Sequence, residues 1–269
     1  MPLSKLKNEV DKMDFNKVIE LVHSTKDLIF DDSLRAQITE KGLADYVTQV
    51  DLRIQEYLTR KLAEEFPDVV MMAEEGDDRV TVQGKKVWIL DPIDGTTNLM
   101  RGMQHSAVSL ALWDNDHMEF GVIYNPFLGE TFTAYAGKGA FLNGTPIRVS
   151  ESATLRDCLV MIGTCPYRKE NAKVNFPLFE KIFMQVMDLR RSGTASLDLA
   201  YVACGRLDCF FELDLKPWDY AAGWLLVQEA GGSLTKWDGT IPDPAQNADL
   251  LVTNGKVHSL FLEQLKEVL

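Results

Sequence analysis

The chain has 269 residues, of which 46% are hydrophobic and 25% charged, so it can bury one large core or two modest ones. Its formal net charge of −12 disfavours a general nucleic-acid binder, which needs a basic face to neutralise phosphates. A small phosphorylated molecule stays compatible with this charge, provided that bound metal ions supply the local positive charge.

Cysteine spacing and hydropathy predict the cellular setting. The four cysteines form no C-x-x-C pair and flank no histidine at zinc-ligand spacing, so reduced thiols are expected. The charged N-terminal segment has no apolar signal region, and no run reaches the roughly 18 apolar residues of a membrane span. The four histidines each stand alone, which disfavours a histidine-based mechanism. These features predict a cytoplasmic protein without a membrane partner.

Helical spacing of apolar residues marks the beginning of the chain. It extends from Val10 to Phe30 and predicts helix there. A second helix is expected from about Thr48 to Phe66, because a proline at the next position stops it. The apolar run 69–72 then predicts a short strand.

Short β-rich segments separated by turn residues follow, and they predict an antiparallel meander. Its strands begin with the one at Trp88 and continue at 105–113, 119–124 and 130–135. The later part of the chain alternates strands at 158–163, 207–213 and 250–253 with helices at 174–184, 196–204, 217–230 and 256–269. This change of pattern predicts an N-terminal α+β subdomain, residues 1–148, and a C-terminal α/β subdomain, residues 149–269.

The segment W-I-L-D-P-I-D-G-T-T-N-L, residues 88–99, places two carboxylates at the end of a buried strand. Asp94 is well placed as the N-cap of a helix that begins near Gly95. Two converging carboxylates, Asp91 and Asp94, repel each other unless a cation lies between them, and Mg²⁺ prefers such oxygen ligands. The following Gly-Thr-Thr offers free backbone N–H groups to an anion. The segment therefore predicts a metal and phosphate site, although a simple helix cap stays open for Asp94.

Two further acidic positions could complete such a site. Glu74 and Glu75 follow the predicted strand 69–72, and Asp219 opens the predicted helix 217–230. Each has a purely structural alternative, an exposed turn or an N-terminal cap, so spacing alone leaves both interpretations open.

These segments resemble the signature motifs of the inositol monophosphatase family, in the lithium-sensitive, magnesium-dependent phosphatase superfamily. The resemblance covers nearly the whole chain. The motifs around Arg190 and Pro217 look most like those of the bacterial branch of the family. Its motifs are D-Y-V-T-Q-V-D at 45–51, A-E-E-G at 73–76, the segment 88–99, G-K-G-A-F-L-N-G at 137–144, R-R-S-G-T-A-S-L-D at 190–198 and L-K-P-W-D from 215. It implies a layered αβαβα sandwich of the α+β class, with an N-terminal antiparallel sheet and paired helices, a smaller C-terminal α/β half, and a homodimer.

The resemblance also implies a set of magnesium ligands. Glu74, Asp91 and the backbone carbonyl of Ile93 would hold the first ion. Asp91, Asp94 and Asp219 would hold the second, and Glu74 would help with a third, weaker ion.

Substrate contacts follow from the same resemblance. Gly95 and Thr96 would bind the phosphate through N–H groups beside Asp94, and Thr96 with Glu74 would orient the attacking water. Glu212 and the backbone near Ser196 would contact polyol hydroxyls. The remaining candidates near the site are Lys41, Asp45, Glu75, Cys165, Arg168 and Arg191, of which Arg191 is a candidate for substrate or interface contact.

The resemblance implies a magnesium-dependent phosphomonoesterase acting on inositol 1-phosphate or a similar polyol or sugar monophosphate. Fructose 1,6-bisphosphate, 3′-phosphoadenosine 5′-phosphate and NADP are alternative substrates, but they would need more basic residues near the pocket. A different class also stays open, a regulatory partner of the transcription or RNA machinery that acts through protein contact.

Overall fold

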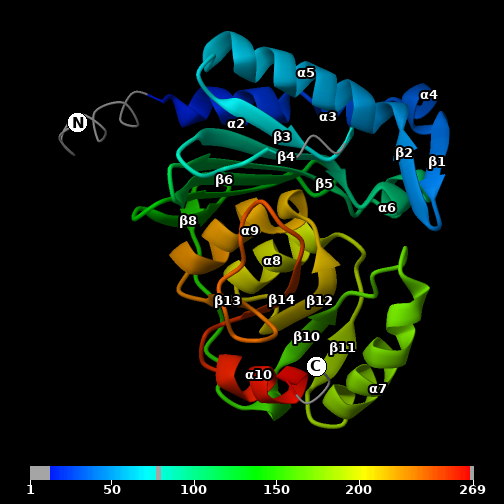
Figure 1. Ribbon diagram of the computed structural model, residues 1–269, viewed down its shortest axis with the longest axis vertical. Coiled ribbons are helices and arrows are strands. Elements are labelled where there is room, and N and C mark those ends of the chain that lie inside the picture. Colours follow the sequence, from blue (N-terminus) through cyan, green and yellow to red (C-terminus); the bar gives the residue numbers. More distant parts are fainter. Residues whose placement is uncertain (1–12, 77–79, 267–269) are drawn as a thin grey trace.

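Helices and sheets alternate in layers in the structure, a computed structural model that describes residues 13–76 and 80–266 (Figure 1). The larger sheet has the strand order β3-β4-β5-β6-β7-β8-β9. It is antiparallel except for the parallel pair β3 and β4, as the meander pattern predicts. Its strands are β3 (Val70–Ala73), β4 (Lys86–Asp94), β5 (Ala107–Asp114), β6 (His117–Asn125), β7 (Glu130–Tyr135), β8 (Gly139–Leu142) and β9 (Thr145–Pro146).

Both faces of this sheet are covered, which explains why its central strands carry apolar residues on both faces. Along β4 and β5 the side chains alternate between two cores. Leu90 and Leu110 face the outer helices, whereas Ile89 and Ala111 face the middle layer. The outer helices are α2 (Phe15–His23), α3 (Lys26–Ile29), α4 (Asp32–Arg35) and α5 (Gln49–Glu65).

The helix expected between Val10 and Phe30 is shorter and broken in the structure, and Val10 lies outside the described residues. After α2, the hydroxyl of Thr25 donates to the carbonyl of Val22, and a new short helix begins. Farther on, Asp31 accepts hydrogen bonds from the N–H groups of Ser33 and Leu34 and thereby starts α4. Local hydrogen bonds between side chains and the backbone thus accompany the breaks between these helices, although the apolar spacing continues to Phe30.

The smaller sheet has the order β11-β10-β12-β14-β13. Helices α8 (Ala195–Ala203) and α9 (Pro217–Glu229) lie between the two sheets, and α9 packs on β5, β6 and β7 (Figure 1). Helices α7 (Ala172–Phe183) and α10 (His258–Lys266) cover its other face. Its strands are β10 (Leu159–Ile162), β11 (Asp188–Arg190), β12 (Cys209–Leu215), β13 (Ser233–Lys236) and β14 (Ala248–Thr253). The expected helices and strands of this half are confirmed with small shifts in their ends, except that the expected end of the last helix, 267–269, lies outside the described residues.

The periodicity missed a two-stranded hairpin, β1 (Ile38–Gly42) with β2 (Asp45–Thr48). Every residue of β1 is exposed, so the strand carries no alternation of apolar and polar residues. The hairpin matters because it brings Lys41 toward the end of β3.

The predicted boundary between residues 148 and 149 falls between the last strand of the large sheet and the first of the small one. One hydrophobic core nevertheless includes β4–β8 together with α8 and α9. The division into two subdomains, like the homodimer, stays a prediction. None of the helices in the described ranges is both long and apolar enough to cross a membrane.

Candidate active site

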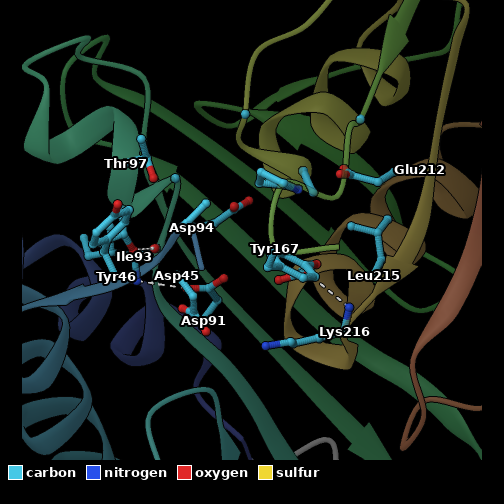
Figure 2. Close-up of a pocket in the computed structure, with 18 of the residues that line it drawn as sticks. Asp45, Tyr46, Asp91, Ile93, Asp94, Thr97, Tyr167, Glu212, Leu215 and Lys216 are labelled. Atoms are coloured by element: carbon cyan, nitrogen blue, oxygen red, sulfur yellow. Dashed lines mark hydrogen bonds between the residues drawn. The ribbon is translucent and has the colours of Figure 1, made fainter. Parts of the chain in front are cut away.

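A cavity of about 790 Å³ opens where the ends of β4 and β12 approach each other. Figure 2 shows Asp91 and Asp94 on one side of it and Glu212, Tyr167 and Lys216 across from them. The predicted site residues that line it are Asp45, Glu74, Asp91, Ile93, Asp94, Gly95, Thr96, Arg191, Glu212 and Asp219. The structure therefore brings together residues from five separate motifs.

Asp91 and Asp94 both belong to the last turn-like end of β4. The pairing of β4 with β5 shifts register between these two residues, which breaks the alternation of the strand. Oδ1 of Asp91 accepts a hydrogen bond of 3.0 Å from the N–H of Ile93. This local bond fixes the carboxylate at the strand end, beside the carbonyl group of Ile93.

Asp94 does cap a helix, but not the one expected. The short helix α6 (Thr96–Met100) begins after Gly95, which takes the N-cap position with φ of +86°. Oδ2 of Asp94 instead accepts a hydrogen bond of 2.6 Å from the N–H of Ser196 in α8, whose own N-cap residue makes no side-chain cap. The expectation of an α6 cap is thus wrong, because the unpaired N–H group that Asp94 satisfies lies 102 residues away along the chain.

Ser196 lies fully buried behind the cavity wall. The N–H of Ser196 donates to Asp94. A contact of the backbone near Ser196 with substrate hydroxyls stays a prediction. Asp198, two residues farther along α8, does line the cavity, and it accepts a hydrogen bond of 2.6 Å from the hydroxyl of Ser192. Sequence reasoning assigned no role to Asp198.

Asp219 combines the two interpretations that the sequence left open. It lies at the third position of α9, after Pro217, and its Oδ2 accepts a hydrogen bond of 2.7 Å from the N–H of Lys216. The side chain is therefore a cap, and it also lines the cavity opposite Asp91.

The carboxylates of Glu74, Asp91, Asp94 and Asp219 repel one another. Burial raises the pKa of Asp91 and of Asp219 well above the ordinary range, and neighbouring carboxylates raise both further. Burial likewise raises the pKa of Glu74 and of Asp94. Such crowding is costly without a nearby positive charge, which is why the arrangement favours a bound cation.

The donors fit magnesium in their chemistry. All are hard oxygens, and three of the carboxylates are oriented by a backbone N–H that donates to one of their oxygens. Across the described part of the chain, no three Asp, Glu, His or Cys side chains already have the geometry to hold a metal ion. Side-chain rotation from the present hydrogen-bonded positions would be needed to close on an ion.

Lys41 is the nearest described cation to this cluster. Its Nζ lies 3.1 Å from Oε1 of Glu75 and 3.6 Å from oxygens of Asp45 and Glu74. Gln55 fixes the backbone of Glu75 through hydrogen bonds of 2.5 and 2.9 Å. The structure thus places Lys41, Asp45 and Glu75 around Glu74, although none of them was assigned a direct role.

The hydroxyl of Thr96 has a partner that the sequence reasoning missed. It lies 2.8 Å from Oδ1 of Asp51 and 3.0 Å from the carbonyl oxygen of Ile93. Asp51 is fully buried at the start of α5, where its other oxygen accepts from the N–H of Thr48 at 3.0 Å. Burial raises the pKa of Asp51 to about 6, against the lowering effect of its hydrogen bonds with Thr48 and Thr96. The capping pattern T-x-x-D at 48–51 was the available signal, but it reads as a helix start alone.

The start of α6, which is predicted to bind phosphate, is tied to the other half of the molecule. The amide nitrogen of Asn98 lies within 3.1 Å of the carbonyls of His105 and Ser192 and the hydroxyl of Thr194. A side chain at Gly95 would lie 2.3 Å from that same hydroxyl, so only glycine fits the approach. The start of α6 is therefore held rigidly against the segment that precedes α8.

The wall opposite the carboxylates holds several further polar groups. Arg191 contacts the hydroxyl of Thr164 at 3.3 Å. The ammonium group of Lys216 lies 5.5 Å from the ring of Tyr167 and 5.7 Å from that of Trp218. Arg168 does not line this cavity: it pairs with Asp214 at 2.9 Å beside a second cavity, because the chain turns away after Tyr167.

Known proteins resemble the chain along most of its length. A sequence model of the inositol monophosphatase family matches residues 8–269. A Thermotoga maritima protein named fructose-1,6-bisphosphatase/inositol-1-monophosphatase is 36% identical over 96% of this chain and 97% of its own. A Xylella fastidiosa protein named Nus factor SuhB is 40% identical over 75% of this chain and 73% of its own.

A solved structure agrees with these matches. The Thermotoga maritima IMPase superposes with a TM-score of 0.85 at 34% identity, and the match covers 94% of this chain and 97% of that one. This agreement confirms the layered α+β fold that the resemblance implied. The chain therefore belongs to the inositol monophosphatase family and is a phosphatase of that superfamily.

Proposed function

We propose that the protein is a magnesium-dependent phosphomonoesterase that hydrolyses inositol 1-phosphate or a similar polyol or sugar monophosphate. The observation that supports this most is the meeting of Glu74, Asp91, Asp94 and Asp219 in one cavity. The same cavity includes the Gly95-Thr96 start of α6 on one wall and Glu212 on another.

Glu74, Asp91, Asp94, Asp219 and the carbonyl of Ile93 would hold two magnesium ions, with a third near Glu74. When bound, such ions lower the pKa of a coordinated water and stabilise the leaving oxygen. The fit rests on the all-oxygen donor set and on the raised pKa of each buried carboxylate.

The chain's own residues position the reactants. Asp51 fixes the hydroxyl of Thr96 so that its lone pairs can direct a water toward phosphorus. Backbone N–H groups at Gly95 and Thr96 would bind the phosphate oxygens. Glu212 would accept hydrogen bonds from hydroxyls of the alcohol part of the ester.

A monophosphate is favoured by the few cations available for a second phosphate. Among the described residues, three cations line the cavity: Arg101, Arg191, which contacts Thr164, and Lys216, which lies over two aromatic rings, whereas Arg168 is paired with Asp214 outside it. Fructose 1,6-bisphosphate stays the second candidate, because the Thermotoga maritima relative carries both activities in its name. 3′-Phosphoadenosine 5′-phosphate and NADP are further alternatives that the same assay can include.

The direct test is phosphate release from this substrate panel with and without magnesium. The proposal expects magnesium-dependent hydrolysis, with inositol 1-phosphate preferred over fructose 1,6-bisphosphate in kcat/KM. Family resemblance also leads us to expect inhibition by lithium.

A regulatory role is the candidate from another class, since relatives are named Nus factor SuhB. Copurification of a transcription component by a protein that hydrolyses nothing in the panel would favour that role over the enzyme.

A further inference from the structure

A short loop at the end of β10 contacts the side chain of Glu212. Ile162 is paired with Phe211 in the parallel ladder between β10 and β12, and the N–H of Gly163 donates to the carbonyl of Phe211 at 3.0 Å. The loop 163–165 therefore begins beside Glu212, where the two strands reach the cavity.

The loop binds the carboxylate of Glu212 through its backbone. The N–H of Cys165 donates to Oε1 of Glu212 at 2.9 Å. Cys165 takes a left-handed backbone conformation with φ of +45°, which turns this N–H toward the carboxylate. Burial raises the pKa of Glu212 to about 7, while the N–H groups of Cys165 and Thr164 lower it. The loop thus stabilises the ionised form of a carboxylate that burial disfavours.

Gly163 leaves room for that carboxylate because it has no Cβ atom. A Cβ atom at Gly163 would lie 1.9 Å from Cδ, 2.0 Å from Oε2 and 2.4 Å from Cγ of Glu212. The carboxylate therefore lies directly against the Cα atom of the glycine. Because the clashing atoms are the far end of a flexible side chain, alanine at this position would displace Glu212 at little cost to the fold.

The loop itself is held in place from outside. Arg191 donates to the hydroxyl of Thr164 at 3.3 Å. Pro166 and Tyr167, which follow the loop directly, line the cavity together with Gly163. Glu212 is thus oriented by backbone that is fixed on both sides.

We propose that Gly163 is a specificity-determining positioning residue, because it lets the 163–165 loop orient Glu212 toward hydroxyls next to the substrate's phosphate. This inference rests on the proposed function. It predicts that the contact between the Glu212 carboxylate and Gly163 determines the preference for esters of polyhydroxy alcohols. Cleavage of the phosphate ester itself should not depend on this contact.

The test compares two esters in Gly163→Ala: inositol 1-phosphate, whose alcohol carries hydroxyls, and p-nitrophenyl phosphate, whose alcohol carries none. The readout is the ratio of their kcat/KM values. We expect the ratio to fall about tenfold through a higher KM for inositol 1-phosphate, the loss typical of one hydrogen bond to a charged group.

Gly232→Ala is the matched control. Its Cβ would also collide with neighbours, the carbonyl of Thr253 at 2.6 Å and Val227 at 2.7 Å, but far from the cavity. This variant should lower the stability and leave the ratio unchanged.

A double-mutant cycle separates positioning through Glu212 from a general disturbance. Glu212→Ala should lower the ratio, and adding Gly163→Ala to it should lower the ratio no further. Multiplicative effects of the two changes, or an unchanged ratio in Gly163→Ala, would overturn the inference.

Glu212→Asp provides a second route should Gly163→Ala fail to fold. It keeps the charge but shortens the side chain, which removes the carboxylate from the N–H of Cys165. A wild-type ratio in this variant would also overturn the inference. Hydrolysis of neither ester by the wild type in magnesium overturns the proposed function itself, whereas hydrolysis of both with an unaffected ratio overturns only the role of Gly163.

Discussion

The hydroxyl of Thr96 lies 2.8 Å from Oδ1 of Asp51, although 45 residues separate the two in the chain. One residue begins helix α5 and the other begins α6, so the contact joins the outer helical layer to the end of β4. The carboxylate of Asp51 can accept a hydrogen bond from the hydroxyl of Thr96, and the lone pairs of that hydroxyl can then point into the cavity.

Removal of this hydroxyl should slow the reaction without weakening substrate binding. We expect Thr96→Ala to lower kcat by about 10²-fold or more with KM nearly unchanged, a loss typical of a group that positions proton transfer. Thr96→Ser keeps the hydroxyl and should recover most of the rate. Thr97→Ala, at the exposed neighbouring position, is the control. Equal losses in the Ala and Ser variants at position 96 would contradict this role.

Asp91 should be indispensable to activity and costly to the metal-free fold. We expect Asp91→Asn to abolish hydrolysis, while Ile93→Leu, which keeps the backbone carbonyl, is tolerated. In EDTA at neutral pH, Asp91→Asn should raise the free energy of unfolding, because it removes a carboxyl group whose pKa is raised by burial and by neighbouring carboxylates. Urea denaturation measures this, and near-normal phosphatase activity in Asp91→Asn would refute the assignment.

The metal-free protein should lose stability as the pH rises. Burial and mutual repulsion raise the pKa of Glu74, Asp91, Asp94 and Asp219 in the folded chain. The folded state then holds more protons than the unfolded state above the ordinary carboxyl range near pH 4, so the free energy of unfolding decreases from there through neutral pH.

Magnesium should remove most of this dependence, because a cation binds the ionised carboxylates of the folded state. Thermal unfolding at pH 5 and pH 8, with EDTA and with magnesium, checks both statements. A metal-free protein that is more stable at pH 8 than at pH 5 would contradict the proposed electrostatics.

Asn98 should be important for stability. Its buried amide contacts the carbonyls of His105 and Ser192 and the hydroxyl of Thr194. Asn98→Ala removes the amide donor to all three, although the carbonyl of His105 still accepts from the hydroxyl of Thr194, and should lower the free energy of unfolding by about 1–3 kcal/mol. Asn16→Ala, at an exposed position, should change it little. Urea unfolding of both variants gives the comparison, and equal small effects would show that the Asn98 contacts are dispensable.

Local patterns were enough to predict much of the fold. Apolar alternation predicted β7 at 130–135 to the residue, and the proline after Phe66 marked the end of α5 correctly. The N-terminal helix was predicted too long because the chain leaves α2 at Thr25, whose hydroxyl donates to the carbonyl of Val22, inside an otherwise continuous apolar stripe. A hydrogen bond between a side chain and the backbone within the stripe leaves the apolar spacing unchanged, so periodicity does not reveal it.

The site shows a different limit. The acidic strand end at 91–94 was visible in the sequence, because two carboxylates three residues apart are conspicuous there. The partner of Asp94 was not, since the N–H of Ser196 reaches it only after the second half has folded. Asp51 was missed for a related reason: its contact with Thr96 depends on how α5 lies against β4. Roles set by long-range packing leave no local signal.

Asp94 ends a strand of the large sheet and at the same time holds the N-terminus of α8 in the other half. If Asp94 binds a metal ion as proposed, the proposed metal site and the packing of the two halves depend on the same side chain. A chain in which only the first sheet had formed would leave this carboxylate in water, without the helix that orients it. Catalytic activity would then report complete folding, because the proposed site forms only in a chain that has both sheets in place.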